Sequence, residues 1–424
     1  MSWGIVGKEK LVRSVPTVVD WFRRPGSLSG RLFYSMTKSV SGSPCFAATQ
    51  AKRERVTVLP TVILGSLAVA AGLLEKVDQP QYHAGDIRIP AAAANEPLNS
   101  GFSLPAAQRY LTDGSRVWTE QRKCISCHTN GTFMQLAPAV PGLFEQEIQR
   151  HRTFFVGEIN RLADAPEATL KKGYQPTQLA YLAQGLASFD RHGSGQLSTE
   201  TDRALDLMLQ SQSEDGSYQN VPCWPPLESS EYHSATVAAQ ALGLAPGYLA
   251  GVDPAQQAVI AQLKHYLQTT QPPHDYARVL LLWASTRWDG LVSESRKRAI
   301  IEMILSHQRE DGGWSIRSFG TPETWAGGVR SAKLRAEPEF ETEPSDGHQT
   351  GLAILVLRQA GVPADHPAIR NGVDWLKKNQ RLSGRWWTRS LNTDKAHFIT
   401  YSGTFYPLVA LHLCGELPAG ESPK

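Results

Sequence analysis

Three stretches of this chain align with one another without gaps: ALDLMLQSQSEDGSY (residues 204–218), IIEMILSHQREDGGW (300–314) and GVDWLKKNQRLSGRWW (372–387). In each, a helical pattern ends in Gln, a Gly follows four residues later, and an aromatic residue follows six residues later. We expect the Gly to adopt a positive φ, the Gln amide to bond freed backbone groups, and the aromatic ring to pack on a neighbouring helix. We call this unit a clasp. The three clasps are Gln212, Gly216 and Tyr218; Gln308, Gly312 and Trp314; and Gln380, Gly384 and Trp386.

A more apolar helical pattern follows each clasp: EYHSATVAAQAL, DGHQTGLAILVL and YSGTFYPLVAL. Two further apolar patterns lack a clasp, TQLAYLAQGLASF near Gln178 and DYARVLLLWAS near Asp275. Half-polar helices alternate with them and are expected to begin near Pro105, Phe144, Thr199, Pro254, Glu294 and Pro367. Half-polar helices outside and apolar helices inside are typical of a double ring, so we predict an all-α fold of about six helix pairs.

The Q-x-x-x-G-x-W pattern resembles the QW motif of squalene and oxidosqualene cyclases and of the related prenyltransferase β subunits. The resemblance covers residues 105–415 and implies an (α/α)6 toroid with a central cavity that suits a hydrophobic, isoprenoid-like ligand. The catalytic motifs are missing. The sequence has no D-x-D-D to protonate an alkene and no D-D-x-x-D to hold magnesium, and Cys223 and Cys414 lack the surroundings of a prenyltransferase zinc ligand. We therefore expect no zinc or magnesium site.

Residues 121–134, QRKCISCHTNGTFM, contain a C-x-x-C-H motif in Cys124, Cys127 and His128. Two such thiols can form thioethers with haem vinyl groups while the His binds the iron, so we predict covalent haem c here. Alignment of Gln121 with the clasp glutamines places Cys127 at the aromatic position, which makes the motif a replacement for the first clasp. Met134 is a candidate sixth iron ligand or else a core methionine, and His151 and His83 are weaker candidates. The alternatives are a disulfide or redox pair of Cys124 and Cys127, a zinc knuckle, or free thiols.

Export is the expected route for this chain. The 424 residues include 41% hydrophobic and 20% charged ones, which predicts a large core, and residues 1–55 carry ten basic side chains against three acidic ones. The remainder has 33 basic and 37 acidic residues, which argues against a nucleic-acid surface. The uncharged run 56–74, VTVLPTVILGSLAVAAGLL, is long enough to be a transmembrane anchor or a signal peptide, with Met36 as an alternative start.

These features predict five segments: a basic N-terminal part (1–55), the anchor or signal (56–74), an extended linker (75–104), the helical domain (105–415) and a tail (416–424). Basic residues before the apolar run predict that the domain lies in the bacterial periplasm or on the outer face of the inner membrane.

The beginnings of the inner helices are expected to face the cavity of the toroid. The residues predicted to line this cavity are Trp224, Glu231, Tyr232, His233, His274, Asp275, Tyr276, Trp325, Asp346, His348, Trp387, His397 and Tyr401. Candidate catalytic side chains among them are Glu231, His233, Asp275, Asp346 and His348. Because His233 and His348 hold equivalent repeat positions, they are also candidates for capping their helices. The acidic segment EPEFETEPSD (337–346) is expected to form a solvated loop.

Three functions follow from these features. The first is an exported haem-binding toroid that binds a hydrophobic molecule, with redox chemistry and a redox partner. The second is a diverged terpenoid cyclase or isomerase without haem, whose acid is Asp275, Asp346 or Glu231. The third is a non-catalytic periplasmic binding or scaffold module.

Overall fold

Helices account for nearly all the regular structure in the part of the chain that the computed structural model describes, residues 80–218, 226–227, 230–337, 339–340, 342–392 and 398–417. These residues lie within a single unit of the chain, Pro44–Lys424. The predicted apolar run 56–74 lies outside the described residues, as do Cys45, Cys223, Trp224 and His397. No helix among the described residues is both long and apolar enough to cross a membrane.

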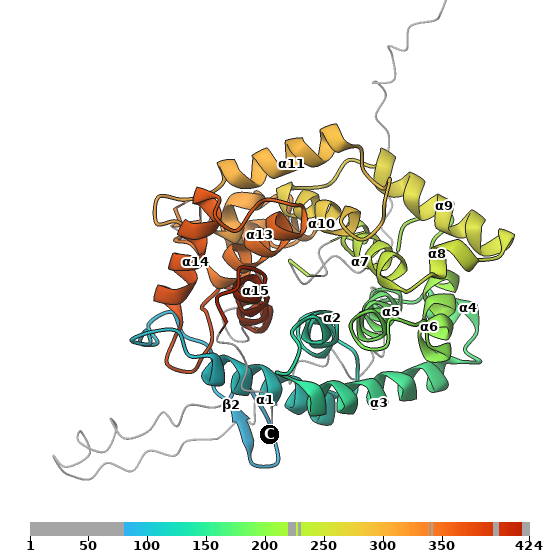
Figure 1. The fold of residues 1–424 in the computed structure, drawn as a ribbon, viewed down its shortest axis with the longest axis horizontal. Coiled ribbons are helices and arrows are strands. Elements are labelled where there is room, and N and C mark those ends of the chain that lie inside the picture. Colours follow the sequence, from blue (N-terminus) through green and yellow to red (C-terminus); the bar gives the residue numbers. More distant parts are fainter. Residues whose placement is uncertain are drawn as a thin grey trace, which may run out of the picture. The chain divides into compact units, whose positions relative to one another are not determined.

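Six helices contact one another in a closed circuit: α2 with α5, α5 with α7, α7 with α10, α10 with α13, α13 with α15, and α15 with α2. We call them the inner helices, and Figure 1 shows them surrounded by the others. Their bounds are α2 Asn130–Leu136, α5 Gln175–His192, α7 Glu231–Leu244, α10 Asp275–Ser285, α13 Gly347–Gln359 and α15 Ile399–Leu413. Five of the six match the apolar patterns that the sequence analysis picked out. The seven-residue helix α2 was not predicted as an inner helix.

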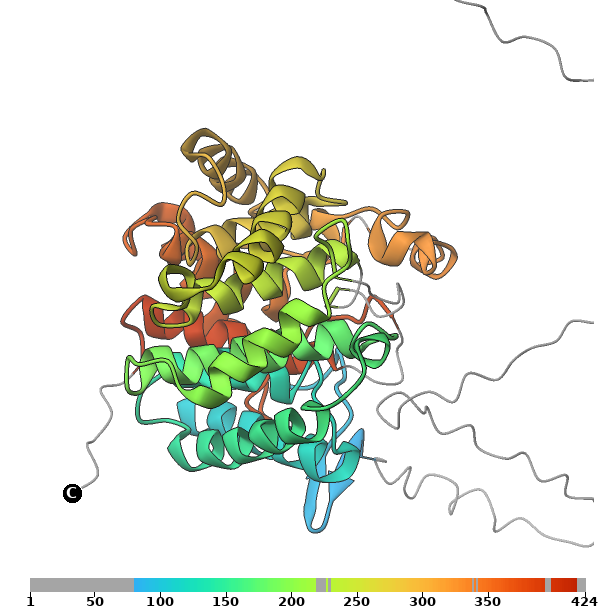
Figure 2. The same ribbon diagram turned by 90° about the vertical axis from the view of Figure 1, so that its right-hand side faces the viewer.

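Six amphipathic helices cover the inner ones (Figures 1 and 2): α1 Leu104–Arg122, α3 Glu145–Leu162, α6 Thr199–Gln210, α9 Pro254–Thr269, α11 Glu294–Ser306 and α14 Pro367–Asn379. All six begin within one residue of the predicted starts. Ser and Asp side chains cap several of them, and Asp253 and Gln256 form a capping box at α9. The remaining helical turns are η2 Ala137–Ala139, α4 Glu167–Leu170, α8 Tyr248–Gly251, η3 Ile316–Phe319, η4 Trp325–Gly328 and α12 Ser331–Arg335.

The clasps have the predicted chemistry. In all three, the Gln side-chain amide donates to the carbonyl oxygen of the clasp Gly over 2.7–2.9 Å. The three glycines have φ values of 88–90°, in the region that favours glycine. The indole N–H groups of Trp314 and Trp386 donate back to carbonyls near the ends of their own outer helices, Ile304 O and Leu376 O, each at 2.7 Å.

Each clasp also joins its outer helix to the next outer helix in the ring. Gly216 packs against the backbone of α9, Gly312 against that of α14, and Gly384 against that of α1. The last clasp therefore joins the end of the helical region to its beginning. Gln380 strengthens this junction, because its amide accepts from the Ser103 N–H at 2.7 Å and donates to the Ser103 carbonyl at 3.0 Å.

The segment before α1 is more structured than the predicted extended linker. Residues Tyr82–Ala84 (β1) and Ile87–Ile89 (β2) pair as an antiparallel hairpin, and both strands contact α1. Figure 2 shows the turn of this hairpin projecting from the helices. Farther along, Glu96 bonds Arg385 and the Ser383 N–H beside the last clasp. Buried Tyr82 and Ile89 supply the apolar contacts that a free linker would lack.

Candidate functional site

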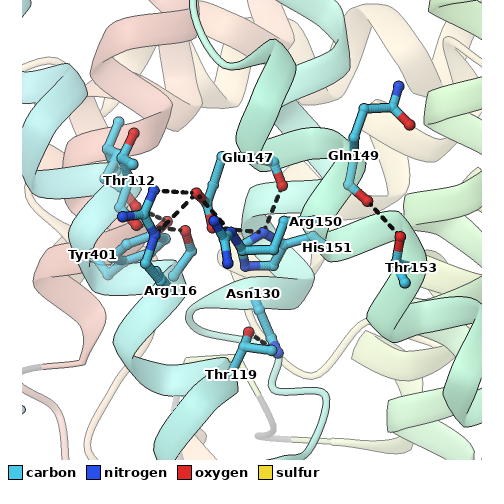
Figure 3. A network of polar contacts seen from close by, with 12 residues as sticks. Thr112, Arg116, Thr119, Asn130, Glu147, Gln149, Arg150, His151, Thr153 and Tyr401 are labelled. Atoms are coloured by element: carbon cyan, nitrogen blue, oxygen red, sulfur yellow. Dashed lines mark hydrogen bonds and ion pairs between the residues drawn. The ribbon is translucent and has the colours of Figure 1, made fainter. Parts of the chain in front are cut away.

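The C-x-x-C-H motif lies in the loop between α1 and α2. The turn begins at Lys123, which has a left-handed conformation with φ of 50°. Asn130 holds the loop: its Oδ1 accepts from the Ser126 N–H at 2.8 Å, and its Nδ2 donates to the Cys124 carbonyl at 2.9 Å. Figure 3 shows the same amide reaching Thr119 of α1. The loop is therefore tied to both neighbouring helices.

The predicted role of Gln121 as a clasp residue is wrong. Its side chain is exposed, whereas the three clasp glutamines are buried or half-buried. The positive φ that ends α1 belongs to Lys123 and not to a residue four positions beyond Gln121. The motif loop is consequently a separate structure and not a fourth clasp.

The side chains of the motif are packed against aromatic rings. Cys124 is disulfide-bonded, whereas Cys127 is a buried, reduced thiol. The His128 ring stacks on Phe398 at 4.6 Å between centroids and meets Trp118 edge-on at 4.6 Å. Burial lowers the pKa of His128 to about 3, with a smaller contribution from Arg122, so the imidazole is neutral at pH 7.

This conformation does not fit a covalently attached haem. Attachment needs both cysteine sulfurs as thioethers, and the Cys124 sulfur is held in a disulfide. Trp118 and Phe398 also pack against Cys124, so the disulfide would have to open and this packing would have to move. The alternative of a disulfide between Cys124 and Cys127 does not occur, because Cys127 is reduced. Within the described ranges, no group of three or more His, Cys, Asp or Glu side chains could hold a metal ion.

The three candidates for the sixth iron ligand differ in position. Met134 is fully buried on α2, where it packs against Gly185 of α5, as a core methionine would. His83 lies on β1 and is exposed. His151 lies on α3 and is fully buried.

His151 belongs to a network of polar contacts between α1 and α3 (Figure 3). Its Nδ1 bonds the Glu147 carbonyl oxygen at 2.8 Å, and Arg116 donates to the buried Glu147 carboxylate at 2.7 and 3.2 Å. Arg150 lies 3.5 Å from the same carboxylate. Burial lowers the pKa of His151 despite these acceptors. Glu147 could not be predicted from the sequence, because a buried carboxylate becomes recognisable only when its partner on another helix is known.

Two tyrosine–histidine pairs join neighbouring inner helices. Tyr181 of α5 bonds His233 Nε2 of α7 at 3.0 Å, and Tyr276 of α10 bonds His348 Nε2 of α13 at 3.0 Å. The second pair extends to α15, because His348 Nδ1 bonds Ser402 Oγ at 2.9 Å. His233 and His348 thus hold equivalent places in the structure, as their repeat positions predicted. Tyr181 and Ser402 could not be predicted from the sequence, since neither belongs to the clasp repeat.

Neither histidine caps its own helix. Ser230 Oγ accepts the first-turn N–H of α7, and the Asp346 carboxylate accepts that of α13. Both imidazoles instead bond tyrosines of the preceding inner helix. Burial lowers the pKa of His233 and of His348 to about 3 in each case, so both rings are neutral at pH 7.

The three candidate acids lie in different surroundings. Glu231 is exposed at the first turn of α7. Asp275 faces the outer helix α11, where His307 bonds it at 3.1 Å and is the main cause of its lowered pKa. Asp346 is buried, which raises its pKa to about 6. Asp346 therefore has a raised pKa of the kind that an acid catalyst needs.

The Asp346 carboxylate is already engaged. One oxygen accepts from the Gln349 N–H at 2.9 Å, and the other accepts from the Ile316 N–H at 2.6 Å. It therefore ties the loop after the second clasp to the start of α13. The sequence at this helix start, D-G-H-Q, has a single acid and therefore forms no acidic cluster.

The acidic segment 337–346 is solvated only in part, because Glu339, Thr342 and Pro344 are exposed whereas Glu343 and Asp346 are buried. Glu337 bonds buried Arg317 at 2.8 Å, and Glu343 bonds Arg389 at 3.0 Å. Phe340 is buried and its ring lies under the Arg317 guanidinium.

Two buried N–H groups beside the histidines have no acceptor among the described residues. The backbone N–H of Ala277 donates to His274 Nδ1 at 3.0 Å, so the proton of this neutral ring lies on Nε2. His274 Nε2 and Trp325 Nε1 are both buried without a partner, on rings whose centroids are 4.5 Å apart. Trp325 also packs against Tyr276 at 5.6 Å. These donors are available to an oxygen of a bound molecule.

Tyr232 and Tyr401, which were also predicted to face the cavity, bond outer helices. Tyr232 donates to the Leu267 carbonyl of α9, and Tyr401 donates to the Leu111 carbonyl of α1 at 2.7 Å. Both hydroxyls therefore face outer helices. Trp387 is half-buried after the last clasp.

Comparison with known proteins supports the cyclase resemblance in part of the chain. Residues 276–414, from α10 to α15, match the family described as squalene-hopene cyclase C-terminal domain. A probable squalene–hopene cyclase of Sinorhizobium fredii is 30% identical over 119 residues, which is 27% of this chain and 16% of that protein. The squalene–hopene cyclase of Bradyrhizobium diazoefficiens is 27% identical over 162 residues, 34% of this chain and 23% of that protein. The chain thus spans less than a quarter of the length of these curated relatives.

The described part of the chain is accordingly mostly helical, and its residues 276–414 are squalene-cyclase-like. The likeness lies in the helices and the clasps, since the acid cluster of the D-x-D-D type is missing.

Proposed function

We propose that this chain is an (α/α)6 toroid of the squalene-cyclase type that binds a hydrophobic, isoprenoid-like molecule beside the first turns of its inner helices. The observation that carries the proposal is the buried, neutral cluster of His233, His274, Tyr276, Trp325 and His348, which we call the aromatic cluster. Aromatic and imidazole surfaces with a few unpaired donors suit an apolar ligand that carries one oxygen. The similarity to squalene–hopene cyclases points to the same ligand class.

The cluster suits binding better than acid-driven cyclisation. A histidine with a pKa of about 3 is protonated in a fraction of about one in ten thousand at pH 7. Asp346 is the one candidate acid that supports a diverged cyclase or isomerase, through its pKa of about 6. Because both of its oxygens accept backbone hydrogen bonds, we expect Asp346 to act as a helix cap. A binding or scaffold module without turnover is thus the nearest alternative.

Tryptophan fluorescence of the purified full chain, titrated with farnesol, tests the binding proposal. We expect saturable quenching that Trp325→Phe reduces by more than half. Trp288→Phe is the matched control, because Trp288 is also buried but contacts Lys264 on an outer helix. Quenching that both variants reduce equally, or that neither reduces, would contradict binding at the aromatic cluster. Gas chromatography after incubation with squalene separates binding from cyclisation.

Covalent haem at Cys124, Cys127 and His128 is a second proposal, together with the export, membrane attachment and redox partner that it implies. The C-x-x-C-H spacing supports it. The disulfide of Cys124 argues against it. Expression with a c-type maturation system, haem staining of a denaturing gel and a pyridine hemochrome spectrum test it. Haem staining of the native chain that is lost in Cys124→Ala and in Cys127→Ala would support covalent attachment. Exported protein that does not stain would refute it.

A further inference from the structure

A small pocket lies among the last turns of the inner helices. All six inner helices line it, through residues that include Gln135 of α2, Gln184 of α5, Gln240 of α7, Trp283 of α10, Gln359 of α13 and Val409 of α15. The aromatic cluster lies at the first turns of α7, α10 and α13, so the pocket lies at the opposite ends of the same helices. It therefore does not depend on the ligand proposed for that cluster.

Two basic side chains line this pocket. Arg287 follows the end of α10, and His192 is the last residue of α5. The Arg287 guanidinium has no hydrogen bond or ion pair with any residue that the structure describes. The lining residues, all of them described, include no Asp or Glu.

The charges around these two groups are cationic. Burial, followed by Arg287, Arg191 and His412, lowers the pKa of His192 to about 4. Burial and Arg191 likewise lower the pKa of Arg287 below its usual value. A partly buried cation with cationic neighbours and no counterion is a favourable partner for an anion.

Amide groups complete the lining. Gln184 Nε2 donates to Gln240 Oε1 at 2.9 Å, and Trp283 Nε1 donates to Gln359 Oε1 at 2.8 Å. The oxygens Gln135 Oε1 and Gln184 Oε1 are buried without a donor. The lining thus offers an unpaired cation together with unpaired acceptors. A protonated phosphate satisfies both, because its anionic oxygens accept from a guanidinium and its P–OH donates to an amide oxygen.

We propose that this pocket binds a phosphate group, held by Arg287 and His192 and by the side-chain oxygens of Gln135 and Gln184. The group is either free hydrogen phosphate or the head of a phosphorylated apolar molecule. Anion binding supplies the counterion that Arg287 lacks.

A structural role for Arg287 makes a different prediction. A cation just beyond the end of α10 stabilises the negative end of the helix dipole. On that view, Arg287→Gln lowers the melting temperature in phosphate-free buffer, and the response to phosphate does not change. On our view, the variant is at least as stable as the native chain without phosphate, and it loses the response.

Thermal unfolding of the full chain, titrated with sodium phosphate at constant ionic strength, distinguishes the two. We expect a saturable rise in melting temperature, with an apparent dissociation constant at least tenfold weaker in Arg287→Gln. Arg370→Gln, which changes an exposed arginine of α14, is the matched control and should respond like the native chain. Sulfate, which has no proton to donate at this pH, should bind at least tenfold more weakly than phosphate.

Geranyl phosphate identifies the source of the phosphate. Tighter binding than that of inorganic phosphate, with competition between the two, would show that the pocket takes the head of an apolar molecule. Binding no tighter than phosphate would indicate free phosphate. The proposal would be overturned if phosphate does not change the melting temperature of the native chain, or if it raises the melting temperatures of the native chain and of Arg287→Gln equally.

Discussion

The junction made by the last clasp can be tested by adding a single methyl group at Gly384. This residue has φ of +88°, and a Cβ there would clash with the Ala106 carbonyl group of α1. Gly361 is a matched control, because its φ is +93° and a Cβ there would meet nothing within 4 Å. An alanine at positive φ costs about 1–2 kcal/mol in either place. At Gly384 the added methyl also forces α1 away from the clasp, which adds about 1–3 kcal/mol.

We therefore expect Gly361→Ala to lower the free energy of unfolding by about 1 kcal/mol and Gly384→Ala by about 3 kcal/mol or more. Urea unfolding followed by far-ultraviolet circular dichroism measures both, and the slope of each transition shows whether cooperativity is kept. Similar losses in the two variants would refute the reasoning, since Gly384 would then be needed for its backbone angle alone and not for closure against α1.

Three further predictions concern buried charges and the disulfide. Asp346 has a pKa raised to about 6 by burial, so its contribution to stability is full below pH 4 and falls as the pH rises towards 6. Relative to the native chain, the free energy of unfolding of Asp346→Asn should therefore rise by about 2 kcal/mol between pH 4 and pH 7. Urea unfolding that shows the same difference between the two chains at both pH values would contradict this. Glu147→Gln removes a charge bonded by partly exposed Arg116 and should cost about 1–2 kcal/mol, whereas Glu158→Gln, in an exposed pair, should cost less than about 0.5 kcal/mol. Dithiothreitol should lower the melting temperature of the native chain but not that of Cys124→Ser; a chain that does not respond to reductant would lack the disulfide.

The repeated features of the fold could be predicted from the sequence because each depends on neighbouring residues. A clasp needs a Gln, a Gly and an aromatic residue within seven positions, and its hydrogen bond from Gln to Gly forms within that unit. The outer helices begin at capping or proline residues that are visible in the sequence, such as Asp253 before α9. Helix α2 was missed because seven residues are too few to show a helical period.

The candidate site could be predicted only in part, because its contacts join distant residues. His233 and His348 stand out by repeat position, yet their partners Tyr181 and Tyr276 lie 52 and 72 residues away. Asp275 and Asp346 look alike in the sequence but have pKa values shifted in opposite directions, since one faces His307 and the other is buried. Arg287 could not be predicted as a site residue, because a single basic residue after a helix is common in sequences. Its lack of a counterion is visible only in the structure.

The two proposed sites lie at opposite ends of the same inner helices, which raises the question of whether one molecule occupies both. His348 and Gln359 are 11 residues apart on α13, which corresponds to about 16 Å at 1.5 Å per residue. A phosphorylated isoprenoid that reaches from the pocket to the aromatic cluster would bind more tightly as its chain lengthens, and the gain would stop once the cluster is reached. Geranyl, farnesyl and geranylgeranyl phosphate form the series to measure. For one shared ligand, Arg287→Gln and Trp325→Phe should each weaken binding of the farnesyl compound. For two separate ligands, Arg287→Gln should weaken only the binding of phosphate, and Trp325→Phe should weaken only the binding of farnesol. The affinity for the three prenyl phosphates should then not depend on chain length.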